Sequence, residues 1–207
     1  MVAIVDYGVG NLFSLKSSFA RVGAEVTVTG DPAVLHAADR IVLPGVGAFG
    51  DAAAKLRATG LDKTIIDEAH RGKPLLGICL GMQLLFDRSF EYGEHRGLGL
   101  VPGNVRPISE VIPADLKIPH IGWNALTLTP HRDKNCIFRC NKNGDHVYFV
   151  HSYYAADCAE SVTAVTEYGA KLTAAVQNGN VYGTQFHPEK SGPVGLTILK
   201  SFCEVTP

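Results

Sequence analysis

The sequence has few charged residues and no concentration of one sign. Charged residues make up 19% of the 207, against about 25% in an average soluble protein. Lysine plus arginine (19) and aspartate plus glutamate (20) leave a formal net charge of -1, and no segment carries the run of basic residues that binds a phosphate backbone. Nucleic acid is therefore not an expected partner.

A long hydrophobic run is also missing. The most apolar stretch, residues 74–86, is broken by two glycines and falls well short of the roughly 18 residues that span a bilayer. The chain opens MVAIVDYG, without the basic segment that precedes the apolar part of a secretory signal. We expect a cytoplasmic protein with no membrane span.

Cysteines are too few and too scattered for a disulfide framework. The five, at positions 79, 136, 140, 158 and 203, are odd in number and include no C-x-x-C. Cys136 and Cys140, with His131 and His146 nearby, have only a weak resemblance to zinc-ligand spacing. The sequence also lacks a G-x-x-x-x-G-K-[ST] phosphate loop. We therefore expect no metal ion, no other cofactor and no ATP-driven chemistry.

The pattern of apolar residues predicts an α/β fold in one domain, residues 1–207. The first half alternates short β-branched runs with helical patterns, which is typical of parallel strands joined by crossover helices. Strands are expected at residues 2–5, 26–28, 41–43 and 75–78, and helices at about 12–22, from about 51, at 61–71 and over 82–86.

The second half has a different texture. After residue 86, glycine, proline and asparagine separate alternating apolar residues, which predicts antiparallel hairpins at 97–105 and further along the chain. The clearest turn is Asn178-Gly179, between Val176 and Val181. A last helix, about 194–203, is expected to bury four apolar side chains: Leu196, Ile198, Leu199 and Phe202.

A candidate nucleophile lies at Cys79, in Gly77-Ile78-Cys79-Leu80-Gly81. This G-x-C-x-G joins an apolar strand to a helical pattern, as in a nucleophile elbow, where a tight turn presents one side chain above the sheet and glycines avoid backbone clashes. The start of a helix favours thiolate over thiol. A buried, inert cysteine is the alternative, but the context favours a nucleophile.

A base for that thiolate is predicted at His187, in His187-Pro188-Glu189. Proline biases the residue before it towards an extended backbone. Residues 187 and 189 then lie on one side of the chain, so that the carboxylate meets the imidazole and orients it. A lone histidine would more often be structural, and the Pro-Glu that follows favours the catalytic interpretation.

Two glycine-rich turns follow expected strands. Pro44-Gly45-Val46-Gly47 lies at the carboxyl edge of the sheet, where its N–H groups, together with that of Leu80, would stabilise an oxyanion. It is equally well explained as a plain turn. The segment at 6–11, DYGVGN, lacks the third glycine of a dinucleotide loop.

With these motifs in this order, the chain resembles the class I (triad) glutamine amidotransferases over nearly its whole length. GICLGMQLLF (77–86) and YGTQFHPEKSG (182–192) mark the wider class. DYGVGNLFSL (6–15), LPGVGAFG (43–50), PHIGWN (119–124) and YFVHSYY (148–154) make it most similar to the glutaminase subunits of imidazole glycerol phosphate synthase. The resemblance implies a flavodoxin-like, doubly wound, mostly parallel sheet with antiparallel hairpins added.

The resemblance also implies a reaction. Cys79 attacks the side-chain amide of glutamine, His187 moves protons and Glu189 holds the imidazole, so that ammonia leaves and water then releases glutamate from a γ-glutamyl thioester. Gly45 and Val46 form one side of the oxyanion hole. The amino-acid head of glutamine is bound by Gln83, Glu91, Ser152 and Tyr153, and the segment around Glu91 is the loosest match.

A chain of this length leaves no room for a (β/α)8 barrel of about 250 residues. The resemblance implies that ammonia passes to a separate barrel, the cyclase subunit, which makes imidazole glycerol phosphate and aminoimidazole carboxamide ribonucleotide in histidine biosynthesis. The docking-face candidates, by matched position, are Asn11, Trp123, Asn124 and Lys190. Trp123 is alternatively a core residue. The 44–47 turn is expected to reorient when the heterodimer forms.

Two other functions stay open. One is a glutaminase subunit of another synthase, such as anthranilate synthase or the pyridoxal phosphate synthase. The second is a non-catalytic, flavodoxin-like regulatory subunit, against which the presence of Cys79, His187 and Glu189 argues.

Overall fold

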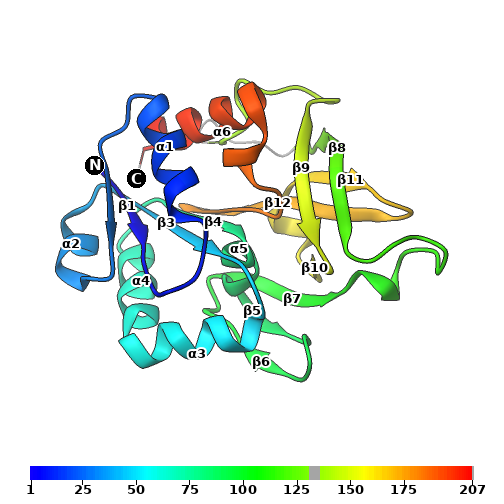
Figure 1. The fold of residues 1–207 in the computed structure, drawn as a ribbon, viewed down its shortest axis with the longest axis horizontal. Coiled ribbons are helices and arrows are strands. Elements are labelled where there is room, and N and C mark those ends of the chain that lie inside the picture. The colour runs from blue at the N-terminus through cyan, green and yellow to red at the C-terminus, as the bar shows by residue number, and fades with distance from the viewer. Residues whose placement is uncertain (131–135, 207) are drawn as a thin grey trace.

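A long twisted sheet runs through the molecule, with helices against both faces (Figure 1). The structure, a computed structural model, describes residues 1–130 and 136–206, and within these ranges the sheet has nine strands in the order β2-β1-β3-β4-β13-β12-β11-β8-β9. The strands that run parallel are β2 (Val26–Thr29), β1 (Val2–Val5), β3 (Arg40–Gly45), β4 (Leu75–Cys79) and β13 (Val181–Thr184).

Antiparallel strands extend this sheet on the β13 side. They are β12 (Lys171–Asn178), β11 (Val162–Glu167), β8 (His120–Leu128) and β9 (His146–His151). A second, smaller sheet has the order β10 (Tyr153–Ala156), β7 (Val101–Pro107), β5 (Phe86–Ser89) and β6 (His95–Arg96). The mostly parallel sheet with added antiparallel strands confirms the predicted fold class.

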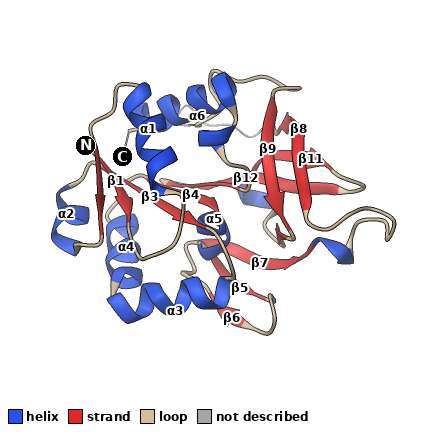
Figure 2. Ribbon diagram, viewed as in Figure 1, coloured by secondary structure: helices blue, strands red, loops and turns tan. Residues whose placement is uncertain are grey.

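Helices cover the parallel part of the sheet on both faces (Figure 2). On one face α1 (Leu12–Arg21) contacts α6 (Gly192–Glu204), and on the other lie α2 (Pro32–Ala37), α3 (Phe49–Thr59) and α4 (Leu61–His70). The short α5 (Leu80–Leu84) follows β4 directly, and the 3-10 turns are η1 (Ile108–Glu110), η2 (Ala159–Ser161) and η3 (Pro188–Lys190). In the described part of the chain, no helix is long and apolar enough to cross a membrane.

The apolar pattern explains why β4 lies in the middle. Its five residues are all buried, with Leu75 packed in the core on the α3–α4 side and Leu76 and Ile78 in the core on the α1–α6 side. A strand covered on both faces needs apolar side chains in both directions. The run at 75–78 therefore places the end of β4, and Cys79 with it, at the carboxyl edge of the sheet.

Several element boundaries differ from the predicted ones. The helix predicted over 82–86 lies two residues earlier: α5 runs from Leu80 to Leu84, because Phe86 already belongs to β5. The short α2 is unpredicted, since six residues show no helical period. Its signals are the N-cap Asp31 and the proline after it.

The hairpin predictions have a mixed outcome. Asn178-Gly179 does join β12 to β13 as an antiparallel hairpin. Residues 97–105 form none, because β7 pairs in parallel with β5 and antiparallel with the distant β10. In α6, Ile198, Leu199 and Phe202 are buried as predicted, whereas Leu196 is only half-buried. The first turn of α3 begins at Phe49 rather than at Asp51.

Replacing Gly81 by alanine is expected to destabilise the fold by about 2–4 kcal/mol, because the new methyl group overlaps the carbonyl oxygen of Leu43 in β3. Chemical denaturation measures this loss. Gly179→Ala is the comparison: it has φ +58° but open space around the added carbon, so it should lose only the about 1–2 kcal/mol of a left-handed backbone. Equal losses in the two variants would contradict a steric cause.

Candidate active site

The turn at Cys79 presents a thiol at the carboxyl edge of the sheet. Cys79 ends β4 with φ 55° and ψ -113°, an unusual backbone for a residue with a side chain, and α5 begins at the next residue. The turn closes tightly. A Cβ on Gly77 would lie 2.6 Å from the carbonyl oxygen of Gly81, and a Cβ on Gly45 would lie 2.7 Å from the backbone nitrogen of Gly81. Glycine is therefore required where β3, β4 and α5 meet.

A cavity of about 540 Å³ opens over this turn, and Cys79, 8% exposed, lies in its wall. Many of the predicted site residues line the same cavity: Val46, Leu80, Gln83, Glu91, Ser152, Tyr153, His187 and Lys190. They come from segments far apart in the sequence: the β3 end, α5, the β5–β6 connection, the β9–β10 junction and the η3 turn. The fold thus brings the predicted residues together around one sulfur atom.

His187 is held between a carboxylate and the thiol. It is 4% exposed, its backbone is extended (φ -97°, ψ 98°), and its Nδ1 lies 2.8 Å from Oε1 of Glu189. Cys79 lines the same cavity and lies close enough to the imidazole to raise its pKa. This is the order of contacts that a thiolate, a base and an orienting acceptor require.

The pKa of His187 is raised to about 9. Burial acts in the opposite direction, but hydrogen bonds and charge from Cys79 and Glu189 outweigh it. The imidazole therefore faces the sulfur as a cation near neutral pH. The Glu189 side chain is only 2% exposed, and within the described residues its Oε2 has no hydrogen-bond partner, so Oε1 alone carries the contact.

Two buried glutamines, one on α5 and one just after β13, form a hydrogen-bonded pair beside the sulfur. Gln185 donates from Nε2 to Cys79 Sγ at 3.8 Å, and its Oε1 accepts from Gln83 Nε2 at 3.0 Å. Gln83 also donates to the carbonyl of Tyr153 at 3.2 Å. Gln185 is absent from the sequence-predicted site, although it stands two residues before His187 in the same motif. Its role depends on a contact across the sheet that no local pattern announces.

The backbone of Val150 also touches the nucleophile candidate. Cys79 Sγ lies 3.9 Å from this carbonyl oxygen, which belongs to β9 just before the cavity-lining pair Ser152 and Tyr153. Since Val150 acts through its backbone, its residue type carries no signal of this contact.

Glu91 has a second task that the sequence did not indicate. One carboxylate oxygen accepts from the N–H of Phe49, the first residue of α3, and so caps a helix whose N-cap, Ala48, has no polar side chain. This cap explains why α3 begins before Asp51. Burial raises the pKa of Glu91. The residue still lines the cavity.

The predicted oxyanion residues lie beside the sulfur. Gly45 is directly opposite Cys79 in the β3–β4 register, and Val46, 45% exposed, lines the cavity together with Leu80. Gly47, with φ +94°, keeps the turn after β3 tight. The turn after β3 therefore borders one side of the cavity, and α5 borders the other side.

The docking-face candidates have different surroundings. Trp123 is 54% exposed, which rules out the core alternative, and Lys190 lines the cavity with its Nζ 5.9 Å from the ring centroid of Tyr148. Asn11 caps α1 by accepting from the N–H of Ser14. The Asn124 side chain is turned inward onto His120.

Metal ligation finds no support in the described part of the chain, where no group of three or more histidine, cysteine, aspartate or glutamate residues is placed to hold an ion. Of the four residues considered for zinc, His131 lies outside the described residues.

Comparisons with known proteins match nearly the full chain. A family model described as glutamine amidotransferase class-I matches residues 3–205. The chain is 47% identical over 205 residues to the imidazole glycerol phosphate synthase subunit HisH of Methanothermobacter thermautotrophicus, covering 99% of this chain and 98% of that protein. It is 48% identical over 205 residues to the same subunit of Moorella thermoacetica, covering 99% and 94%.

A solved structure agrees in fold. The structure of PurLQS from Thermotoga maritima matches with a TM-score of 0.75 at 22% identity, covering 98% of this chain and 97% of that one. At this sequence identity the similarity supports a shared fold and nothing further.

Cys79→Ala should lower the pKa of His187 by about one unit or more, because the thiol is the leading group that raises it against burial. Titration of the imidazole by NMR, with His187→Gln used to assign the resonance, measures the midpoint. Cys140→Ala, at an exposed cysteine, is the matched control and should leave it unchanged. An unaltered midpoint in Cys79→Ala would show that sulfur and imidazole do not interact.

Stability should follow the same titration. Because folding raises the pKa of His187 from 6.5 to about 9, the charged imidazole stabilises the protein fully below about pH 6.5. That contribution is lost as the pH rises through 9. Denaturation curves across this range should therefore show a smaller alkaline loss of stability in Cys79→Ala than in the wild type, and identical losses would count against the interaction.

Proposed function

Because the chain belongs to the class I glutamine amidotransferases, and within them to the HisH-type subunits, we propose that it is the glutaminase subunit of an imidazole glycerol phosphate synthase. It hydrolyses L-glutamine to glutamate and ammonia and delivers the ammonia to a cyclase subunit for histidine biosynthesis. The observation that carries the proposal is the buried His187 imidazole, which contacts Glu189 through Nδ1 and lines one cavity with Cys79, and whose pKa both residues raise.

The reaction begins with sulfur as the nucleophile. The Cys79 thiolate attacks the side-chain amide carbon of glutamine, and the carbonyl oxygen becomes an oxyanion. The protonated His187 donates its Nε2 proton to the amide nitrogen, the C–N bond breaks, and ammonia leaves behind a γ-glutamyl thioester. Neutral His187 then takes a proton from water, whose oxygen attacks the thioester. Collapse of that intermediate releases glutamate and restores the thiolate and the imidazolium.

Other cavity residues bind the charges that appear. The proposed oxyanion donors are the backbone N–H groups of Gly45, Val46 and Leu80. Their position beside Cys79 supports this assignment. The zwitterionic head of glutamine needs both donors and acceptors if its burial is to be tolerated. The residues assigned to this head are Gln83, Glu91, Ser152 and Tyr153, all of which line the cavity.

Ammonia requires an acceptor on a second chain. The proposed partner is a (β/α)8-barrel cyclase, with which this chain forms a cytoplasmic heterodimer. Its docking face includes Asn11, Trp123, Asn124 and Lys190. Exposed apolar side chains support a contact surface here, since Ile121 (57% exposed) and Phe13 (81% exposed) each lie two residues from a candidate, Trp123 and Asn11.

Cys79→Ala is expected to lower glutamine-dependent synthesis by the heterodimer by on the order of 10⁴-fold, since the covalent route is lost. Synthesis from added ammonium salt should continue, because the cyclase site is untouched. Both rates are measured on the complex, with Cys140→Ala as the matched control.

Glutamine-dependent turnover retained in Cys79→Ala would refute the assignment of the nucleophile. A pull-down with the tagged chain that recovers an anthranilate or pyridoxal phosphate synthase, and no cyclase, would assign the glutaminase to a different pathway.

Trp123→Ala should weaken binding of the cyclase subunit by about 10–100-fold, because a large exposed ring at an interface is a typical anchor. Isothermal titration calorimetry measures the Kd. His70→Ala, which removes an exposed ring at the end of α4, serves as the comparison and should bind like the wild type. Equal Kd values for Trp123→Ala and the wild type would place the docking face elsewhere.

A further inference from the structure

Two buried histidines touch each other behind the catalytic cavity. His120 on β8 lies directly opposite His151 on β9, and the two residues are 0% and 5% exposed. Nδ1 of His120 is 3.0 Å from Nε2 of His151, and the rings meet edge to face. His151 lines the cavity that holds Cys79, whereas His120 lies one strand further out and is stacked against Tyr168. The proposed reaction assigns neither of them a task.

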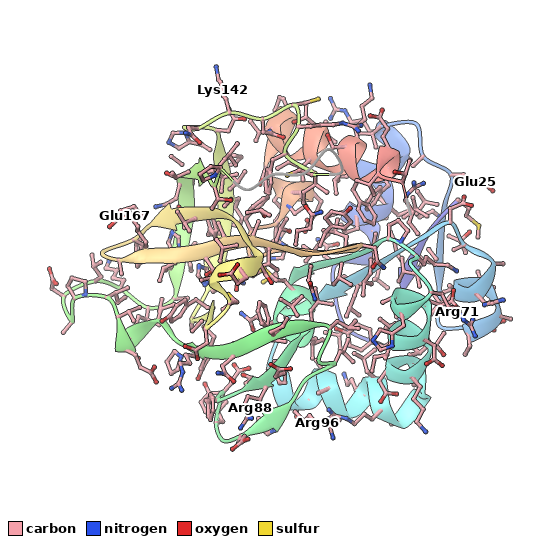
Figure 3. All side chains as sticks on the ribbon, turned by 180° about the vertical axis from the view of Figure 1, so that it is seen from behind. Glu25, Arg71, Arg88, Arg96, Lys142 and Glu167 are labelled. Carbon is pink, nitrogen blue, oxygen red and sulfur yellow. The ribbon has the colours of Figure 1, made fainter. Side chains whose placement is uncertain are left out.

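The pair belongs to a continuous chain of hydrogen bonds. His151 Nδ1 lies 2.8 Å from the carbonyl of Tyr153, the same carbonyl that accepts from Gln83. At the other end, His120 Nε2 lies 2.9 Å from Oδ1 of Asn124, whose Nδ2 donates to the carbonyl of Glu167 at 3.0 Å. Glu167, labelled in Figure 3, ends β11 at the side of the molecule away from Arg71.

This series of hydrogen bonds lacks one hydrogen atom when both imidazoles are neutral. Its ends are carbonyl oxygens, of Tyr153 and Glu167, which only accept. Four contacts connect them, and each needs one hydrogen atom. Each neutral histidine supplies one, and the Asn124 amide supplies one to whichever side its NH₂ group faces. Three hydrogens cannot fill four contacts, so one contact has no hydrogen and is vacant. Rotating the Asn124 amide by 180° only moves the vacant contact from the His120–Asn124 pair to the Asn124–Glu167 pair.

A fourth hydrogen would make the pair a cation, which burial opposes. Burial lowers the pKa of His151 to about 4 and also lowers the pKa of His120. The other titratable groups around the pair or in its cavity are Tyr168, His187, Cys79, Lys190, Glu91, Tyr92 and Tyr153. Near neutral pH the pair is therefore uncharged, and one contact lacks its hydrogen.

The vacant contact is best tolerated at Asn124. In the isolated chain Asn124 is half-buried, so water reaches it, whereas His120 is 0% exposed and His151 is only 5% exposed where it lines the cavity. With the vacancy there, both histidines carry their hydrogen on Nδ1: His151 donates to Tyr153, and His120 donates to His151. This arrangement ties His151, and with it the segment from Val150 to Tyr153, to the outer strand β8.

That segment forms the wall on which the reaction depends. Val150 contributes the carbonyl beside the sulfur, and Ser152 and Tyr153 line the cavity where glutamine is proposed to bind. We propose that His120 and Asn124 are positioning residues for glutamine hydrolysis: Asn124 sets the proton arrangement of the His120–His151 pair, and the pair holds the Val150–Tyr153 wall. The inference rests on the proposed function, and the proton arrangement is testable without it.

The direct test is Asn124→Asp. A carboxylate accepts but cannot donate, and its negative charge favours a proton on His120, so the pair should become a cation. ¹⁵N-histidine NMR of the full chain distinguishes Nδ1–H, Nε2–H and doubly protonated rings. In the wild type we expect two buried neutral rings with hydrogen on Nδ1 at pH 7. In Asn124→Asp the protonation midpoint of the pair should rise by about one pH unit or more.

Asn143→Asp is the matched control. It adds the same charge in the β8–β9 connection, where the side-chain oxygen already accepts from the N–H of Leu128, so the pair should titrate as in the wild type. An unchanged midpoint in Asn124→Asp, or neutral rings with hydrogen on Nε2 in the wild type, would overturn the proton arrangement.

Activity tests the positioning role. Glutamine hydrolysis is measured with the cyclase subunit present. His120→Phe, which cannot donate to His151, should lower kcat/KM for glutamine about tenfold, mainly through KM, and His120→Gln, whose amide still donates, should restore most of it. Wild-type kcat/KM in His120→Phe would overturn the role. A wild type with no glutaminase activity would instead refute the proposed function, and the NMR result would stand.

Discussion

The backbone turn at Cys79 is the constraint on which the remaining features depend. A non-glycine residue with φ 55° costs about 1–3 kcal/mol, and it persists only where its surroundings hold it. Here β4 is paired in parallel with β3 on one side and with β13 on the other, and both faces of the strand are buried. At about 1 kcal/mol net for each hydrogen bond, this ladder outweighs the strain. The turn thereby fixes where the sulfur lies, and the cavity forms around it.

Two buried histidines beside the same cavity have opposite charge preferences. His187 contacts the carboxylate of Glu189 and shares a cavity with the thiol of Cys79, and these two groups raise its pKa to about 9 despite burial. His151 contacts a carbonyl and a neutral imidazole, which offer little to a cation, so burial lowers its pKa to about 4. Environments that separate titratable groups in this way allow one to carry a proton while the other stays neutral. In this molecule the cation faces the nucleophile, and the neutral ring supports the wall.

The sequence allowed the fold class and the triad candidates to be predicted because their signals are local. The G-x-C-x-G turn and the His-Pro-Glu triplet each lie within five residues, and the apolar run of β4 has no other explanation than burial on both faces. Features that depend on contacts across the sheet were missed. Gln185 reaches the sulfur from the residue after β13, Glu91 caps a helix that lies far from it in sequence, and β7 pairs with β5 where a hairpin was predicted.

The central claim is that Cys79 carries the glutamyl group. The most direct measurement is to quench the heterodimer with acid during turnover of ¹³C-labelled glutamine and to map the adduct by mass spectrometry. A labelled γ-glutamyl thioester is expected on the peptide that contains Cys79, and none on the peptides of Cys136, Cys140, Cys158 or Cys203. Rapid glutamine hydrolysis with Cys79 unmodified throughout, or with the label on another cysteine, would contradict it.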